Sequence, residues 1–504
     1  MNHLPPPHSD ATGAGKAKIY HVGTLTYTKA ALVMLFFWLI WGDFCYTVME
    51  SVTGPIMQLK FKALHASNTE IAFLLSALPG TVYSLLNPVI SYKSDRFRSR
   101  WGRRIPFILF SLPFLLLGLV ALAYGEQIGL WLHGHLGFLL KGVSAGQVTI
   151  LTFGALLVLF TPFNTFVTTT FWYLFNDVVP EHLLARFMAW IRVISILSTS
   201  LYWYLIFPYS STHSTETFLG ASLLYLAGIG LLSLNVKEGG YPPRSPYIEG
   251  RTDPLAAVTT FARETHAFPH YWYLWICTFI GCIGNAGSIV GSTLFGLYFC
   301  QKLGLNADQY GAINGSLLIA MGIMTVGAGW LADRYHPIRV VIIGIVIGLF
   351  IVPPVNLIWL FWHPSPHVAY WVILLTDICL AAPGAALGGM WDPPMLMRLF
   401  PRMHFGQFCS TNAVWRTAGG IVGGVLTGAF LDWMTRWVGE DRAYFYLPLW
   451  GFLFGVPSFL LFLKLYQSWK RHGGDDAYLA PVLETLQPVP ISVNPVSVPS
   501  SDSA

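Results

Sequence analysis

Long apolar stretches separated by short polar segments dominate the pattern of the chain. They lie at residues 29–58, 70–92, 105–124, 148–174, 186–208, 218–236, 271–300, 310–332, 338–362, 368–391, 408–433 and 445–468. A helix needs about 20 predominantly apolar residues to cross the hydrocarbon core of a bilayer. In lipid, a helix satisfies its backbone polar groups within a single segment. The pattern therefore predicts an all-α membrane protein with twelve transmembrane helices.

The two halves of the chain resemble each other. Trp38 precedes Asp95 by 57 residues and Trp275 precedes Asp333 by 58, and an arginine follows each acid. Such recurrence indicates a six-helix unit duplicated in tandem. The predicted organisation is a cytoplasmic tail at 1–28, a six-helix bundle at 29–236, a cytoplasmic linker at 237–270, a second six-helix bundle at 271–468 and a disordered tail at 469–504.

The composition agrees with a membrane protein. Hydrophobic residues make up 54% and charged residues 11%, whereas about 25% are charged in an ordinary soluble domain. With twelve spans, 21 of the 29 Lys and Arg residues fall on the side of the termini, 6 on the other side and 2 within spans. This asymmetry predicts cytoplasmic termini in a plasma (inner) membrane. It also explains the net charge of +5 without nucleic acid.

Signatures of enzymes are missing from the sequence. The pair His363 and His367 has a zinc-like spacing, but the prolines between them prevent the helix that would align both rings. There is no phosphate-binding glycine loop and no Gly-x-Ser-x-Gly segment. The six cysteines lie in or beside apolar segments without a Cys-x-x-Cys pair, and we interpret them as reduced packing residues. We expect neither an enzyme nor a cofactor or metal site.

Several charged residues lie inside the predicted spans, where an unpaired charge costs about 3 kcal/mol or more. They are Asp43 and Glu50 in span one, Arg192 in span five, Asp377 and Asp392 in span ten and Arg416 in span eleven. Asp43 and Glu50 share one helical stripe with Tyr46. One interpretation is that these acids take up a proton or cation during transport, tuned by an arginine. The alternative is a static, buried ion pair that fixes helix packing.

Aromatic and polar residues alternate in spans one and four. A sugar needs hydrogen-bonding groups around its rim and a flat apolar surface against its face. The residues that we assign to a solute site are Trp38, Trp41, Tyr46, Asn164, Thr168, Trp172 and Asn285. The alternative is ordinary helix packing, with the hydroxyls bonded back to their own helix. The glycine row of Gly420, Gly424 and Gly428 is better explained by close helix contact than by a ligand.

The segment 94–107, SDRFRSRWGRRIPF, carries a resemblance. With the twelve-span plan, it resembles the major facilitator superfamily, and within it the sucrose–proton symporters and the glycoside–pentoside–hexuronide carriers. The resemblance implies a cytoplasmic latch that closes in one state and opens in another. By position, it assigns a gating role in the first half to Asp95, Arg96, Arg100, Gly102, Arg103, Arg104 and Asp177. It assigns a weaker copy of this role in the second half to Asp333, Arg334 and Arg339.

Three positions depart from the family pattern. Ser91 stands where the family usually has a glycine, although Gly329 keeps this spacing before Asp333. Sugar–sodium members carry acids in span two, but residues 71–92 contain none, which favours a proton over sodium. Sucrose carriers have an arginine five residues before the span-four acid, and Trp172 occupies that position here. Sucrose itself is therefore not implied.

These observations predict a secondary active transporter, monomeric in the bilayer, that moves a sugar or glycoside by proton symport. Solute would bind between the halves near the middle of the membrane, and rocking of the bundles would switch access. A proton-driven exporter of amphipathic compounds is an alternative within the same class. A membrane-embedded enzyme or a non-transporting sensor is the alternative outside it.

Overall fold

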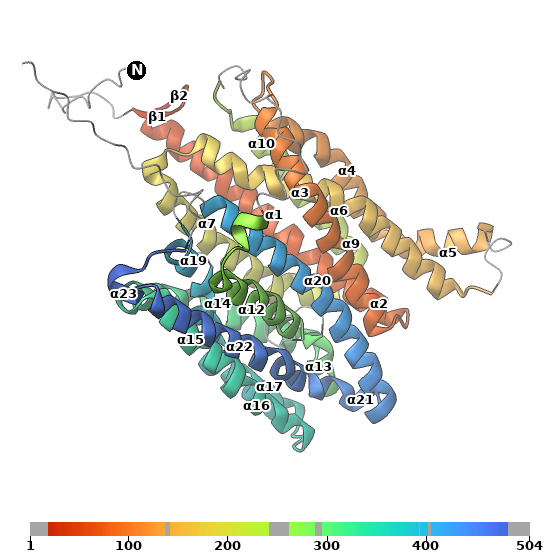
Figure 1. The fold of residues 1–504 in the computed structure, drawn as a ribbon. Coiled ribbons are helices and arrows are strands. Elements are labelled where there is room, and N and C mark those ends of the chain that lie inside the picture. The colour runs from red at the N-terminus through yellow and green to blue at the C-terminus, as the bar shows by residue number, and fades with distance from the viewer. Residues whose placement is uncertain are drawn as a thin grey trace, which may run out of the picture.

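A computed structural model of the chain describes residues 19–136, 142–240, 262–287, 295–392, 394–401 and 405–481. The side chains of Asp95 and Arg96 lie outside the described part. Figure 1 shows long helices running in one general direction across the molecule, with segments of the first half beside segments of the second. The predicted all-α membrane fold is confirmed.

The first half comprises helices that cross and recross the molecule. They are α1 (Lys29–Ala63), α2 (Asn68–Ala72), η1 (Phe73–Ala77), α3 (Leu78–Arg96), α4 (Ile105–Ala123), α5 (Gly125–Leu136), α6 (Ala145–Val178), α7 (Glu181–Leu201), η2 (Tyr202–Ile206), α8 (Phe207–Ser210), α9 (Ser214–Tyr225), η3 (Leu226–Gly230) and α10 (Leu231–Asn235). The segments η1, η2 and η3 are π-helical turns inside otherwise α-helical spans.

The described part of the second half is also helical. Its elements are α12 (Pro269–Asn285), α13 (Gly296–Lys302), α14 (Ala307–Tyr335), α15 (Pro337–Val346), η5 (Ile347–Ile351), α16 (Val352–Leu357), η6 (Ile358–Leu360), α17 (Pro366–Thr376), η7 (Asp377–Ala381), α18 (Ala382–Gly388), η8 (Gly389–Trp391), α19 (Pro394–Leu399), α20 (Phe405–Val438), α21 (Glu440–Ala443), η10 (Tyr444–Tyr446), α22 (Leu447–Arg471) and α23 (Gly474–Ala477).

Eleven helices in the described part are long and apolar enough to cross a membrane. The remaining expected span, 271–300, contains α12, which has 17 residues, and α13, with residues 288–294 between them outside the described part. Twelve spans are therefore consistent with the structure.

Two short segments outside the spans differ from the sequence expectation. Within the expected tail at 1–28, β1 (Tyr20–Val22) and β2 (Leu25–Tyr27) form an antiparallel hairpin. At the other terminus, α22 continues to Arg471, and Tyr478 then donates a hydrogen bond to the Leu399 carbonyl oxygen at 2.9 Å. The start of the expected disordered tail thus packs on the second bundle.

Side-chain caps fix where several helices begin. Ser67, Ser144 and Asn306 each accept a hydrogen bond from the backbone N–H three residues later, and that residue's side chain accepts one from the cap's own N–H. These reciprocal pairs satisfy donors that have no partner inside the helix. The caps mark the helix starts at the end of the molecule farther from the N-terminal hairpin, which we call the distal end.

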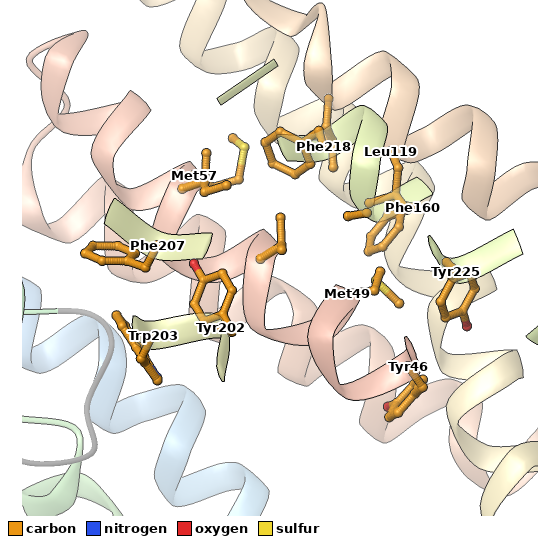
Figure 2. Close-up of a cluster of buried hydrophobic side chains, with 14 of the residues drawn as sticks. Tyr46, Met49, Met57, Leu119, Phe160, Tyr202, Trp203, Phe207, Phe218 and Tyr225 are labelled. Carbon is orange, nitrogen blue, oxygen red and sulfur yellow. The ribbon is translucent and has the colours of Figure 1, made fainter. Parts of the chain in front are cut away.

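The core of the first half is aromatic and surrounds α1. Figure 2 shows Met49 and Met57 of α1 among Phe160, Phe218 and Tyr225 from neighbouring helices, and these side chains belong to one buried cluster. Helix α1 packs against α7, α9 and η3. A Cβ atom on Gly228 of η3 would lie 2.2 Å from Cys45 Cβ, so glycine is needed for this close contact.

The most extensive contacts between the two halves involve α20 and α14 of the second half. Helix α20 packs against α2, η1 and α3, while α14 packs against α7 and η2. The hydrogen bonds between described residues of different halves lie toward the distal end, for example from Tyr298 Oη to the Gln58 carbonyl oxygen at 2.9 Å. At the opposite end, beside the N-terminal hairpin, no hydrogen bond between two described residues joins the halves.

Candidate functional site: a polar ladder and an arginine latch

A polar ladder joins α1 to α6 inside the first half. Tyr46 Oη lies 3.0 Å from Thr168 Oγ1, and one turn further along both helices Asn164 Nδ2 donates to Glu50 Oε1 at 2.6 Å. Tyr46 is buried, whereas Glu50 is exposed although it lies in the middle of a membrane span. In the described part, the partner of the Glu50 carboxylate is an amide and not a cation.

Asp43 forms a second polar contact, between α1 and α7. Ser195 Oγ donates to Asp43 Oδ2 at 2.8 Å, while Asp43 Oδ1 is buried without a hydrogen-bond partner among the described residues. Arg192 lies one turn from Ser195 and is exposed, and it forms no ion pair with another described residue. The expected pairing of Arg192 with Asp43 or Glu50 is absent from the described part.

The charged residues of the second half are arranged differently. Arg416 of α20 forms an ion pair with Asp392, so it is not the partner of the span-one acids. Asp377 opens the π-helical turn η7, is 7% exposed and has no hydrogen-bond or ion-pair partner among the described residues. π-Helical turns frequently occur at functional sites.

The residues assigned to a solute site are spread over several surfaces. Trp41 donates from Nε1 to the Ala227 carbonyl oxygen at 3.3 Å, which ties it to η3. Trp172 is 38% exposed and packs edge-on against Phe175, while Trp38 is half-buried. Asn285 is exposed at the last residue of α12. Tyr46, Thr168 and Asn164 are brought together with Glu50, whereas the three tryptophans and Asn285 do not contact this ladder in the described contacts.

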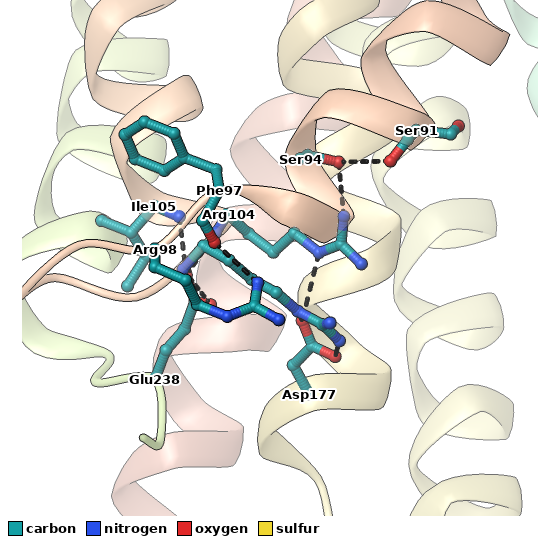
Figure 3. A network of polar contacts seen from close by, with 9 residues as sticks. Ser91, Ser94, Phe97, Arg98, Arg104, Ile105, Asp177 and Glu238 are labelled. Carbon is teal, nitrogen blue, oxygen red and sulfur yellow. Dashed lines mark hydrogen bonds and ion pairs between the residues drawn. The ribbon is translucent and has the colours of Figure 1, made fainter. Parts of the chain in front are cut away.

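An arginine latch ties the loop after α3 to the end of α6 (Figure 3). Arg103 Nε donates to Asp177 Oδ2 at 2.9 Å, and Arg104 Nε donates to the same oxygen at 3.1 Å. Arg104 is 4% exposed, donates to Ser94 Oγ, and lies 4.9 Å from the centre of the Tyr173 ring. The buried Asp177 carboxylate thus pairs with two guanidinium groups, and its negative charge offsets part of their positive charge.

Glu238, the second residue of the expected linker, completes this latch. Its carboxylate accepts hydrogen bonds from the backbone N–H groups of Arg103 and Arg104, each at 2.8 Å, and of Ile105 at 2.7 Å. The N–H groups belong to the first residue of α4 and to the two residues before it, and at a helix start such groups have no acceptor within the helix. Gly102, at φ +102°, leaves room for Glu238, since a Cβ there would lie 2.4 Å from Glu238 Cδ. We call Gly102, Arg103, Arg104, Asp177 and Glu238 the first-half latch.

The other residues expected in a latch lie elsewhere. Arg100 is exposed and stacks over Trp101. Asp333 is 84% exposed and pairs with Arg398 at 3.5 Å, whereas Arg339 pairs with Asp475 and Arg334 stacks over Trp330 and Tyr335. In the described part, the second half therefore has no counterpart of the doubly bonded carboxylate of the first half. The side chains of Asp95 and Arg96 lie outside the described part.

His336 lies beside these second-half charges, between the spans formed by α14 and α15. Its Nδ1 accepts the backbone N–H of Ile338 at 3.3 Å, and its ring packs against Trp469. Burial, and then the nearby positive charge of Arg398, lower the pKa of His336 from 6.5 to about 4. Its backbone has φ +69°, an uncommon conformation for a residue with a side chain.

Sequence reasoning did not identify Ser195, Glu238, Asn87 or Ser94 as parts of the site. Asn87 Oδ1 accepts from Thr169 Oγ1 at 2.8 Å, which adds α3 to the polar contacts of α6. Ser195, Asn87 and Ser94 are small polar residues near or within apolar spans, and Glu238 is a charged residue at the start of the linker. Residues of both kinds are common at positions without a functional role. Ser195 lies three residues after Arg192, on the same face of a helix, and this spacing is the signal that could have pointed toward it.

Comparisons with known proteins agree with this architecture. One bacterial structure, of a homologue of the human lysosomal transporter Spinster in an inward-facing state, matches with a TM-score of 0.62 at 14% identity, covering 88% of this chain and 99% of the other. A D-xylose–proton symporter structure matches with a TM-score of 0.58 at 15% identity, covering 85% and 97%. At such identities, the likeness concerns the fold alone.

Curated relatives match over a short segment. The membrane-associated transporter proteins of Mus musculus and Homo sapiens are each 36% identical over 86 residues, which is 17% of this chain and 15% of theirs. Solute carrier family 45 member 4 of Homo sapiens is 29% identical over 137 residues, 26% of this chain and 17% of its own. The chain thus aligns with less than a fifth of the length of these relatives. The family model of the Major Facilitator Superfamily matches residues 39–423, and the chain belongs to this superfamily of membrane transporters.

Proposed function

We propose that this transporter moves a small polar solute, a sugar or glycoside, by proton-coupled symport with alternating access. The observation that supports this best is the ladder of Tyr46, Glu50, Asn164 and Thr168 at the α1–α6 contact. Hydroxyl, amide and carboxylate groups in one row match the hydrogen-bonding rim of a sugar. Trp172, partly exposed on the same α6, supplies an aromatic surface of the kind that stacks on a sugar ring.

The coupling part of the proposal rests on acids that lack a positive partner. Asp43, Glu50 and Asp377 have hydroxyl or amide partners, or none, among the described residues. A static ion pair would need a cation beside each acid, and Arg192 and Arg416 do not fill this role in the described part. Uptake of a proton would remove the cost of an uncompensated charge in the membrane.

The asymmetric contact between the halves supports alternating access. The halves are hydrogen-bonded toward the distal end, and no such bond between two described residues lies at the end of the N-terminal hairpin. With the cytoplasmic termini that the distribution of Lys and Arg predicts, this arrangement corresponds to an inward-open state of a monomer in the plasma membrane.

Reconstituted protein tests the proposal. Proteoliposomes are supplied with a radiolabelled panel of monosaccharides, disaccharides and glycosides under a gradient of one pH unit. With one proton per solute, this gradient supports about tenfold accumulation, because one pH unit corresponds to about 1.36 kcal/mol. Glu50→Gln should abolish accumulation but keep solute exchange between the two sides. Glu126→Gln is the matched control, since Glu126 is a half-exposed residue that pairs with Lys60 on the same half.

A cationic solute is a second candidate, favoured by the same excess of acids over arginines at this depth. The panel therefore includes amino sugars and aliphatic amines. Accumulation of amines without sugars would replace the first proposal by the second. Gradient-driven extrusion of amphipathic dyes would favour the exporter instead, and the absence of any solute flux would contradict all three.

A further inference from the structure

A chain of hydrogen bonds crosses repeatedly between the two halves at the distal end. Lys62 Nζ donates to Tyr444 Oη at 3.1 Å, Tyr444 Oη donates to Asn68 Oδ1 at 2.8 Å, and Asn68 Nδ2 donates to Asp432 Oδ1 at 2.9 Å. Lys62 and Asn68 belong to the first half, whereas Tyr444 and Asp432 belong to the second. Every bond in this chain therefore joins one bundle to the other.

Asp432 of α20 makes the densest of these contacts. Its Oδ1 accepts from the backbone N–H and from Nδ2 of Asn68, each at 2.9 Å. Its Oδ2 accepts from the backbone N–H of Thr69 at 2.9 Å and from Thr69 Oγ1 at 2.6 Å. A carboxylate that accepts four hydrogen bonds is a strong, charge-assisted contact.

The first turn of the span Asn68–Ser91 depends on both halves for its caps. Ser67 Oγ accepts the N–H of Glu70 at 3.2 Å, which is a contact within the first half. The two preceding N–H groups, of Asn68 and Thr69, bond instead to Asp432 of the second half. These N–H groups have no acceptor within their own helix, so separation of the halves would leave them to water.

The glycine row of α20 brings the backbones of the two halves into contact. A Cβ atom on Gly428 would lie 2.5 Å from the Asn68 carbonyl oxygen, and one on Gly424 would lie 2.7 Å from Ser76 Oγ. Any side chain there would push α20 away from α2 and η1 of the other half. These two glycines thus serve the contact between bundles rather than packing within the second bundle.

Lys62 adds an ion pair and two cation–π contacts to the contact between the two halves. Its ammonium lies 3.2 Å from Glu440 Oε1 and between the rings of Tyr298 and Tyr444, 5.5 and 5.6 Å from their centres. Glu440 and both tyrosines belong to the second half. We call Lys62, Asn68, Thr69, Asp432, Glu440 and Tyr444 the distal clasp.

We propose that the distal clasp is the gate of the distal end, and that Asp432 is the residue that sets how often this gate opens. The first-half latch cannot fill this role, because it joins α4, α6 and the linker within one half. The distal clasp joins the halves themselves, so it must break completely when the distal end opens. The inference rests on the alternating access of the proposed function, but it needs neither the solute nor the coupling ion.

A cysteine reporter tests the gate without transport. In protein whose native cysteines are replaced, Ser76→Cys places a thiol beside the Gly420 carbonyl oxygen of α20, since Ser76 Oγ lies 3.5 Å from it. The labelling rate with a charged maleimide is measured in nanodiscs, where both faces are accessible. Asp432→Asn replaces one acceptor oxygen by an amide that faces two donors. We expect it to raise the labelling rate at least tenfold, and Thr69→Val, which removes one donor, to raise it less.

Asp441→Asn is the matched control at the same end of the molecule. Asp441 is exposed and pairs with Lys302 at 2.7 Å, and both residues belong to the second half. Its labelling rate should equal that of the parent protein. Unchanged labelling in folded Asp432→Asn and Thr69→Val, or an equal rise in Asp441→Asn, would overturn the gate. If the gate responds as expected but no solute moves in proteoliposomes, the gate stands and the proposed solute transport falls.

Discussion

Gly102→Ala perturbs the first-half latch at its tightest point. The new Cβ would lie 2.4 Å from Cδ and 2.5 Å from Cβ of Glu238, so the whole glutamate side chain must move. The substitution also places a Cβ on a residue with φ +102°, which favours glycine. Both effects act at the loop that carries Arg103 and Arg104.

The expected cost has two separable parts. Backbone strain at such a φ costs about 1–3 kcal/mol. Displacement of Glu238 removes three hydrogen bonds to a carboxylate, and because Glu238 is half-buried and water replaces part of them, we take about 1–2 kcal/mol for the set. Gly102→Ala should therefore reduce the free energy of unfolding by about 2–5 kcal/mol.

Two comparisons separate these parts. Gly439 also has a positive φ, +86°, but a Cβ there meets no atom within 4 Å, so Gly439→Ala measures strain alone. In the Glu238→Ala background, Gly102→Ala should lose the displacement part, and the double-mutant cycle should show a coupling above about 1 kcal/mol. Detergent-induced unfolding monitored by tryptophan fluorescence provides the free energies. Coupling near zero, or equal costs for Gly102→Ala and Gly439→Ala, would refute the contact between Gly102 and Glu238.

Further predictions concern the charges near the termini. Asp177→Asn leaves Arg103 and Arg104 without their shared carboxylate and should lower the free energy of unfolding by about 3 kcal/mol. Asp333→Asn should lower it by less than about 0.5 kcal/mol, because the ion pair of Asp333 with Arg398 is exposed. Unfolding curves of both variants check this contrast. His336 is neutral in the folded protein down to about pH 4 but takes up a proton near pH 6.5 once unfolded, so its contribution to stability is present above that pH and lost progressively as the pH falls from about 6.5 to 4. His336→Asn keeps a side-chain acceptor for the start of α15 and tolerates the positive φ, so it should flatten this part of a melting-temperature profile; an unchanged acid slope would contradict the assignment.

The spans were predictable because their signal is local. Apolar length alone identifies a helix that crosses a bilayer, and the described helices fall on the expected stretches. The predicted ends of the spans were less accurate where polar side chains contact residues that are distant in sequence. Helix α1 runs to Ala63 rather than 58, since Lys60 and Lys62 pair with Glu126 and Glu440 at the distal end. Hydropathy counts these lysines against a helix, although they stabilise its last turn.

Contacts between distant segments were the part that sequence reasoning could not supply. The grouping of Arg103 and Arg104 with Asp177 followed from a resemblance, and the role of this group as a latch stays a prediction. No motif or spacing in the sequence marked Glu238 or Asp432, because a carboxylate on a linker or near a helix end is usually solvated. Their partners lie 133–135 and 363–364 residues away in sequence, and the fold alone brings them together.

Paired distance measurements across the two ends test the central claim, that the halves rock around a solute. One spin-label pair joins Ala63 and Arg442 at the distal end, and another joins Glu181 and Tyr335 near the termini; all four positions are exposed. Addition of a transported solute with a change of pH should lengthen the first distance in part of the molecules and shorten the second in the same proportion. Two distances that stay fixed under every condition, or that change together in the same direction, would contradict alternating access in this protein.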